Sequence, residues 1–248
     1  MITGFYTGAQ GARSFQQNMD VISNNIANVN TYGYKPQRLS FSDLIRTGVR
    51  PNLVGIDPSL EVGHGQRGIE TAIDMAMSAV EVTDHTYDVC IQGNGFFAVA
   101  APGGDIYYTR DGNFHVSVEA DGEYLVNSMG WYVLGPDEQP VLLPADTQDF
   151  ILAGPDASGD NVVYLGVFEF ANPYALSLAG QNLYSPSETS GAITPSSAPV
   201  IQGALERSGV NLAKEIVSMI RTQRAYQLSL RTVSIADEIE QMTNGMRT

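Results

Sequence analysis

Three glycines in the first third of the chain, Gly63, Gly65 and Gly68, have the spacing G-x-G-x-x-G. In dinucleotide-binding proteins this motif cradles a pyrophosphate, and a carboxylate further along, here Asp84, binds the ribose. The motif works only between a strand and a helix of a βαβ unit. Downstream of Gly68 the sequence instead alternates short apolar runs with turns, so we interpret residues 63–68 as a connector and expect no nucleotide cofactor.

The other reactive side chains of the sequence form no catalytic or metal-binding pattern. His64, His85 and His115 lack the mutual spacing of metal ligands, and Cys90 has no second cysteine with which to share a metal. Cys90 lies in an apolar run and is expected to be a small buried core residue. Most acids lie in turns, as solvated carboxylates do, and Asp156 to Asp160 lack a calcium-loop pattern. We therefore expect no enzymatic activity, no metal and no other cofactor.

The charge of the 248-residue chain is −14 and is unevenly distributed. Residues 1–35 and 203–248 each carry a net charge of +1, whereas residues 36–202 carry five cations and 21 acids. This acidic middle argues against binding to nucleic acid, which requires cations that neutralise phosphates. The near-neutral ends suit packing against other copies of the chain, and the acidic middle suits a solvated outer surface or serves solubility alone.

Two kinds of membrane-related segment are not expected in this sequence. An apolar run long enough to cross a bilayer is missing from it. The first cation is Arg13, so the N-terminus lacks the basic region that begins a secretory signal. We expect a protein that does not span a membrane and that carries no cleaved secretory signal.

Four asparagines lie close together near the N-terminus: Asn24, Asn25, Asn28 and Asn30. Asparagine is a poor helix former, because its amide competes for backbone hydrogen bonds. Between apolar neighbours such an amide fixes the register of helix packing more than it adds stability. We favour roles at subunit interfaces for the first three. The alternative, helix capping or turn formation, applies most strongly to Asn30.

The N-terminal segment has apolar residues at helical spacing. Two sets repeat every seven residues: Phe5, Ala12, Met19 and Ile26, and then Phe15, Ile22 and Val29. Gly4, Gly8 and Gly11 weaken the first turns, so this helix should need partners. Gly33 is placed to end it with a left-handed cap.

The C-terminal segment is the longest predicted helix, with Asn211 as its N-cap. Two apolar stripes lie on nearly opposite faces: Leu212, Ile216, Met219, Tyr226, Leu230 and Val233 on one, and Val217, Leu228, Ile235, Ile239, Met242 and Met246 on the other. A helix with two apolar faces has neighbours on both sides. One neighbour could be the N-terminal helix, and the other would come from elsewhere. Arg224 and Tyr226 are of types enriched at interfaces, although a purely intrachain role for Tyr226 is equally open.

From Val89 onward the pattern predicts short antiparallel strands separated by glycine-rich turns. The expected strands are Val89–Ile91, Phe96–Ala100, Ile106–Thr109, Phe114–Val118, Tyr124–Val126, Trp131–Leu134 and a long one at Val162–Phe170. We predict an α+β fold with paired N- and C-terminal helices as a coiled-coil domain and a central, mainly antiparallel β domain. The expected domains are 1–35 with 203–248 (helical), 36–88 (an extended connector) and 89–202 (the β domain with a connector).

Three blocks of the sequence resemble the flagellar axial proteins, the family of basal-body rod and hook subunits. The first block is Asn18–Lys35, the second pairs Ile91–Phe97 with Tyr108–Phe114, and the third runs from Gly203 to Gln227. The blocks follow the order of the family and span nearly the whole chain. Gly209 departs from the asparagine that is usual at its position in the third block, which loosens the expected start of the helix.

The resemblance implies a non-enzymatic structural subunit that assembles helically into a hollow, torque-transmitting tube. A place in the distal rod is favoured, with the proximal rod or the hook as alternatives. The implied partners are further copies of the chain, other rod subunits, the hook, surrounding ring proteins and the flagellar type III export apparatus, and the implied location is the periplasm-spanning basal body. An alternative from another class is a binding module with an acidic β domain and helical oligomerisation ends.

Under the favoured interpretation, side chains of the two terminal segments form the assembly interface. The expected interface residues are Phe5, Ala12, Phe15, Met19, Ile22, Asn24, Asn25, Ile26, Asn28, Val29, Leu212, Ile216, Met219, Arg224, Tyr226, Leu230, Val233, Ile235, Ile239 and Met242.

Overall fold

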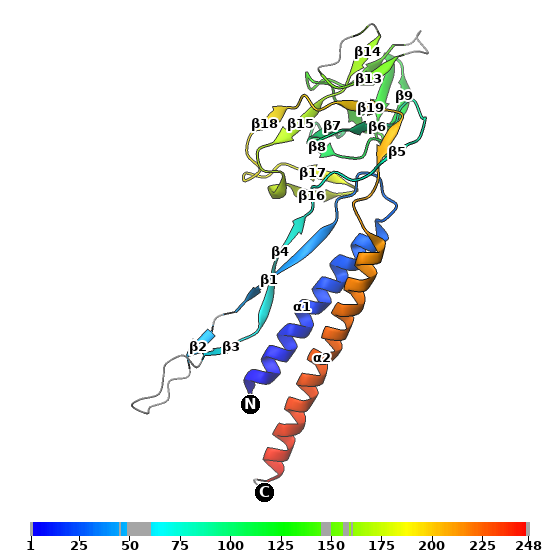
Figure 1. The fold of residues 1–248 in the computed structure, drawn as a ribbon. Helices are drawn as coiled ribbons and strands as arrows, with labels where there is room; N and C mark the ends of the chain where they lie inside the picture. Colours follow the sequence, from blue (N-terminus) through cyan, green and yellow to red (C-terminus); the bar gives the residue numbers. More distant parts are fainter. Residues whose placement is uncertain are drawn as a thin grey trace. The chain divides into compact units, whose positions relative to one another are not determined.

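The computed structural model describes residues 2–44, 46–48, 61–144, 150–155, 159 and 161–246 and shows an α+β fold (Figure 1). The predicted fold class, with two terminal helices and a central antiparallel β region, is confirmed. The chain divides into two compact units. The helical unit comprises Met1–Ala27, Gln37–Ile73 and Asn211–Thr248, and the β unit comprises Asn28–Pro36 and Asp74–Val210.

Two long antiparallel helices, α1 (Ile2–Ala27) and α2 (Leu212–Gly245), dominate the helical unit and lie side by side in Figure 1. The predicted N-cap of α2 is confirmed, because the side-chain oxygen of Asn211 accepts a hydrogen bond from the Lys214 backbone N–H at 3.1 Å. The same unit contains two antiparallel strand pairs. These are β1 (Gln37–Asp43) with β4 (Gln66–Ile73), and β2 (Arg46–Gly48) with β3 (Glu61–Gly63).

The N-terminal helix is shorter than the sequence predicts. It ends at Ala27, and Gly33 lies in the β unit instead of capping it. Gly33 does adopt the left-handed conformation, with φ +66°. A Cβ there would lie 2.6 Å from the carbonyl of Arg110, so this position requires glycine for close approach to another segment as well as for its backbone angle.

A ten-stranded sheet forms most of the β unit. Its strands are β7 (Phe96–Ala100), β8 (Ile106–Thr109), β9 (His115–Glu119), β10 (Gly122–Val126), β11 (Tyr132–Val133), β12 (Leu142–Leu143), β15 (Val167–Phe170), β16 (Ser177–Gly180), β17 (Leu183–Ser185) and β18 (Ile193–Pro195). Further pairs are β5 (Val80–Val82) with β20 (Ala204–Glu206), β6 (Val89–Ile91) with β19 (Val200–Gln202), and β13 (Ile151–Ala153) with β14 (Val162–Tyr164). A short 3-10 helix, Pro173–Ala175, lies between β15 and β16.

The predictions of individual strands succeed where turns flank them. Strands β6, β7 and β8 are confirmed at the predicted bounds. The prediction of one long strand at Val162–Phe170 is wrong, because β14 and β15 are separated by Leu165 and Gly166. A Cβ at Gly166 would lie 2.5 Å from the Gly135 carbonyl oxygen, so the chain bends at a point where two backbones nearly touch.

The core of the β unit is a continuous apolar cluster that includes Phe97, Val99, Leu125 and Val133, all fully buried. Cys90 is 1% exposed, and burial raises the pKa of its thiol to about 11. The thiol is therefore protonated at neutral pH, as expected for a structural core residue.

Residues 36–88, expected as an extended connector, hold strands β1 to β5. The stretch up to Ile73 groups with the helices, and the stretch from Asp74 groups with the β unit. The β1–β4 pairing explains this division, because β4 pairs with β1 along its length and both strands contact α1.

The close approach at Gly166 gives a stability prediction. We expect Gly166→Ala to lower the free energy of unfolding of the β unit by about 1–3 kcal/mol, because the added methyl group overlaps the Gly135 backbone. Gly103→Ala is the control, since a Cβ there meets only the Asp105 carboxylate at 4.0 Å. Denaturant unfolding followed by circular dichroism would measure both, and equal stability of the two variants would contradict the argument.

Candidate assembly interface and charged junction

The two helices of the helical unit meet through small and polar side chains. Gly8 lies so close to Val233 that a Cβ on the glycine would be 3.0 Å from the valine methyl group, and Gly11 faces Ser229. Further along, the Asn18 amide donates a hydrogen bond to the Thr222 hydroxyl at 3.0 Å. This polar pair fixes the alignment of the helices, while the glycines allow their backbones to approach closely.

Many of the large apolar side chains of α2 are exposed instead of packed against α1. Of the α2 residues the structure describes, only Thr222 is buried. The exposed apolar side chains, which range from 41% to 81% exposed, are Leu212, Ile216, Val217, Ile220, Leu228, Leu230, Ile235, Ile239, Met242 and Met246. A helix that exposes this many large apolar side chains is typical of an interaction site.

The predicted interface residues separate into three groups by exposure. Phe5, Asn24, Leu212, Ile216, Arg224, Leu230, Ile235, Ile239 and Met242 are exposed, and Phe15, Met19, Ile26, Asn28, Val29, Met219, Tyr226 and Val233 are partly exposed. Ala12, Ile22 and Asn25 are buried within the chain. The structure brings most of the set together on α1 and α2, whereas Asn28 and Val29 lie in the β unit.

Asn25 has a defined intrachain role. Its amide nitrogen donates to the Gln37 carbonyl at 2.8 Å, and its amide oxygen accepts from the Gln37 N–H at 3.0 Å. The side chain thus pairs with the backbone at the start of β1, as a neighbouring strand would. Asn28 accepts a hydrogen bond from the Thr31 hydroxyl in the turn after α1. Roles of Asn24, Asn25 and Asn28 between subunits stay a prediction.

The β unit contains a buried cluster of three charged side chains that the sequence did not single out. Glu206, at the end of β20, is 2% exposed and accepts from the Lys35 ammonium at 2.6 Å and from the Arg110 guanidinium at 3.3 Å. The Ser78 N–H also donates to this carboxylate, at 2.8 Å, and Lys35 donates to the Ala76 carbonyl at 2.7 Å. Three stretches distant in sequence therefore converge on the carboxylate of a fourth.

Burial dominates the electrostatics of this cluster. Burial lowers the pKa of Lys35, and the adjacent Glu206 carboxylate opposes that change. Arg110 donates to the Gly93 carbonyl at 2.6 Å and lies 5.5 Å above the centre of the Phe96 ring, an additional cation–π contact. A signal for the cluster was present in the sequence, since Glu206 directly follows the apolar residues of β20.

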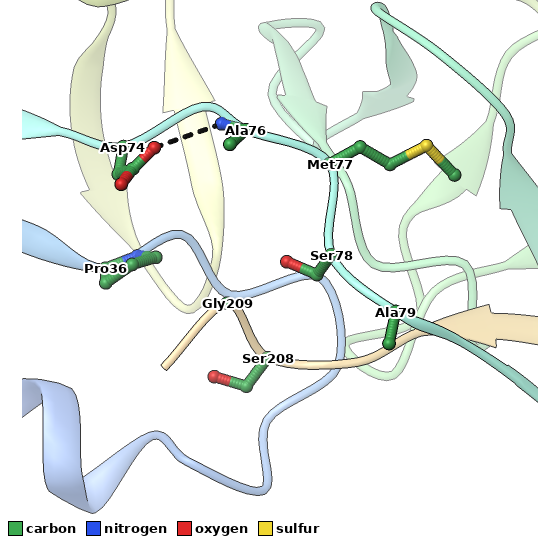
Figure 2. A pocket seen from close by; sticks show the side chains of 8 residues that line it. All are labelled: Pro36, Asp74, Ala76, Met77, Ser78, Ala79, Ser208 and Gly209. Atoms are coloured by element: carbon green, nitrogen blue, oxygen red, sulfur yellow. Dashed lines mark hydrogen bonds between the residues drawn. The ribbon is translucent and has the colours of Figure 1, made fainter. Parts of the chain in front are cut away.

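A small polar cavity of about 190 Å³ adjoins the cluster (Figure 2). The stretch Asp74–Ala79 runs along it, opposite Pro36, and Ser208 and Gly209 close it. A Cβ at Gly209 would lie 2.8 Å from the Pro36 ring and 3.0 Å from the Ser78 hydroxyl. The packing at position 209, where the family pattern has asparagine, thus leaves little room for a side chain.

Neither the cavity nor the cluster resembles a catalytic centre. Among the described residues, no group of three or more histidine, cysteine or acidic side chains is arranged to hold a metal ion. In the same part of the chain, no helix is long and apolar enough to cross a bilayer. What the arrangement does provide is a β unit with a buried core and an apolar helix surface.

Comparison with known proteins gives matches along most of the chain. Three family models match: "Flagella basal body rod protein" over residues 5–35, "Flagellar hook protein FlgE/F/G D1 domain" over 90–154, and "Flagellar basal body rod FlgEFG protein C-terminal" over 201–246.

Curated relatives match over the full length. The flagellar basal-body rod protein FlgG of Buchnera aphidicola (subsp. Acyrthosiphon pisum) is 34% identical, with 97% of this chain and 98% of the relative covered. FlgG of Bacillus subtilis is 32% identical, with 97% of each chain covered. The flagellar hook-basal body complex protein FlhP of Bacillus subtilis is 26% identical, with both chains covered completely.

Because its carboxylate is buried, Glu206 should contribute far more to the free energy of unfolding than the exposed Glu81. Glu206→Gln leaves Lys35 and Arg110 buried without a counter-charge, and we expect it to cost about 3–5 kcal/mol of stability. Glu81→Gln is the control, because the Glu81–Arg207 pair is solvent-exposed and should contribute less than about 1 kcal/mol. Chemical denaturation of both variants tests this, and a Glu206→Gln protein as stable as the control would refute the importance of the cluster.

The Asn25–Gln37 pairing predicts a local effect. Asn25→Leu removes both partners of the Gln37 backbone, and we expect a loss of about 1–3 kcal/mol that is confined to the helical unit. Hydrogen exchange should show faster exchange along β1 and unchanged protection of β7. Gln16→Leu, an exposed change on the same helix, is the control. Unchanged exchange along β1 in Asn25→Leu would show that the pairing is dispensable.

Proposed function

Since this chain belongs to the family of flagellar basal-body rod proteins and is a structural, non-enzymatic subunit of the basal body, we propose that its copies assemble helically into a hollow tube that transmits torque from the motor to the hook. The outward apolar surface of α2 is the observation that supports this most directly. Contacts that repeat from copy to copy without closing a ring generate an open helical filament.

The division of faces on α2 explains how one helix serves both the subunit and the tube. Its small and polar positions, such as Thr222 and Ser229, contact α1 of the same chain. Its apolar positions, such as Ile216 and Ile235, remain for other copies. Burying a side chain of this size contributes about 1.5–3 kcal/mol, so several per subunit offset the entropy lost on association.

The charges of the two units support an assembly in which neighbouring copies contact each other through their helical units and not through their β units. The helical unit carries ten cations and nine acids, and the β unit carries three cations and 18 acids. Lys35 and Arg110 are buried on Glu206, and Arg207 pairs with Glu81. The surface of the β unit is therefore strongly acidic. Neighbouring β units would repel each other unless separated, which favours contact through the helices.

We further propose a place in the distal rod, with the proximal rod and the hook as alternative positions. The similarity to several FlgG rod proteins over nearly their full length supports this assignment. Partners would then be other rod subunits, the hook and the surrounding ring proteins. Export would proceed through the flagellar type III apparatus without signal cleavage, placing the subunit in the part of the basal body that spans the periplasm.

The experiment that tests the assembly compares two charge insertions at exposed apolar positions. Ile216→Asp with Ile235→Asp on α2 should abolish filament formation by the purified chain, because the interface would bury unpaired carboxylates. Neither change should destabilise the monomer, since both side chains are about half exposed. Sedimentation and electron microscopy measure the assembly.

The matched control places the same charge on the β unit. Val118→Asp alters a side chain that is 74% exposed on β9 and should leave assembly unchanged. Filaments of the α2 variant that form at the rate of the unmodified chain would contradict the proposed interface. Loss of assembly in the control alone would place the contact on the β unit instead.

A further inference from the structure

The charges of α2 are segregated along its length. From Leu212 to Arg231 the helix carries four exposed cations and one acid, Glu215 in the first turn; the cations are Lys214, Arg221, Arg224 and Arg231. From Thr232 to Gly245 it carries three exposed acids and no cation; these are Asp237, Glu238 and Glu240. One exposed helix thus has a basic segment (residues 212–231) followed by an acidic segment (residues 232–245).

The basic segment presents its charges on one side. The four cations are separated by seven, three and seven residues, spacings that keep them on neighbouring positions of the helix surface. Scattered charges of both signs are typical of a helix face that contacts only solvent. A basic segment that is followed by an acidic segment gives the helix a direction along its axis.

These charges have no ionic partner within the part of the chain that the structure describes. Lys35, Arg110 and Arg207 form ion pairs in the β unit, none of them with a residue of α2. The opposing helix α1 contributes one cation and one acid, Arg13 and Asp20. The exposed apolar residues of α2, among them Ile216 and Ile235, lie beside the charges. The surface therefore combines apolar area with unpaired, segregated charge.

We propose that α2 of a second copy docks parallel to this helix and is displaced along it, so that the basic segment of one copy faces the acidic segment of the next. The mean positions of the two segments' charges differ by about 16 residues, or roughly 24 Å along the helix. This inference rests on the proposed assembly of the chain and adds the feature that sets its axial stagger.

Competing alignments are disfavoured by the same charges. With no displacement, basic segments would face each other, as would acidic segments, and like charges across an interface select against the pairing. The apolar residues supply attraction in many alignments, whereas the segregated charges distinguish among them. The contact is heterologous, because each copy offers its basic segment to one neighbour and its acidic segment to another. Each step is displaced in the same direction along the helix, so the series does not close into a ring.

Charge reversal with complementary mixing tests the proposal. Arg221→Glu with Arg224→Glu makes both segments acidic, and Glu238→Lys with Glu240→Lys makes α2 predominantly basic. Each variant alone should polymerise at least about tenfold more slowly than the unmodified chain at low salt. An equimolar mixture of the two should recover most of the rate, because each supplies the charge that the other lacks. Light scattering and electron microscopy would follow assembly.

A third variant identifies the acidic partner. Glu119→Lys with Glu123→Lys changes the net charge by the same amount as Glu238→Lys with Glu240→Lys, but on the β unit. Mixed with the Arg221 and Arg224 double variant, it should give no recovery. Recovery with this variant, and none with the α2 acid variant, would show that the basic segment binds the β unit and would overturn the proposal.

The outcomes separate this inference from the proposed function. Failure of the unmodified chain to form filaments would contradict the proposed assembly itself. Normal filaments of the unmodified chain, together with unchanged rates for both α2 charge variants, would overturn only the charge-set stagger. Raising the salt concentration should weaken assembly of the unmodified chain and reduce the differences between variants, since these exposed charges are screened within about 10 Å at 0.1 M salt.

Discussion

One buried carboxylate, that of Glu206, joins the segment that follows α1 to the segment that precedes α2. Lys35 lies in the segment that follows α1, and Glu206 lies shortly before α2, so their contact connects two points 171 residues apart in the sequence. Arg110 ties the same carboxylate to the β sheet. Because a buried charge without a partner is strongly destabilising, these segments are held in one arrangement. The cluster thus orders, within the β unit, the segments that flank the helices in sequence. Few residues of α2 itself are buried: of those that the structure describes, only Thr222 is.

The small number of buried residues in α2 distinguishes the helical unit from an ordinary antiparallel helix pair. Such pairs usually bury their large apolar residues between the helices. Here glycine, serine, threonine and asparagine make much of the contact, together with Val233, and the side chains of Leu212, Ile216 and Ile235 are exposed. The pair is specified by polar contacts more than it is stabilised by burial. Its stability would therefore increase on association, when the exposed apolar residues of several copies become buried together.

The sequence predicted what depends on local pattern and missed what depends on distant contacts. Strands β6 to β8 and the Asn211 cap follow from short-range periodicity and turn chemistry. Gly166 does not, because its role arises from the carbonyl of Gly135, which no local pattern reveals. The end of α1 at Ala27 was missed for a related reason, since Gly33 is required by its approach to Arg110. Apolar periodicity identified residues of α2 but not which face would meet α1.

The separation of functions on the two sides of α2 has an evolutionary consequence. Substitutions at Gly8, Thr222 or Ser229 alter the contact between α1 and α2 and so the subunit itself. Substitutions among the outward residues leave that contact intact. The outward side of α2 is therefore free to diverge with the filament that a lineage builds, while the side that contacts α1 is constrained by the fold of the subunit.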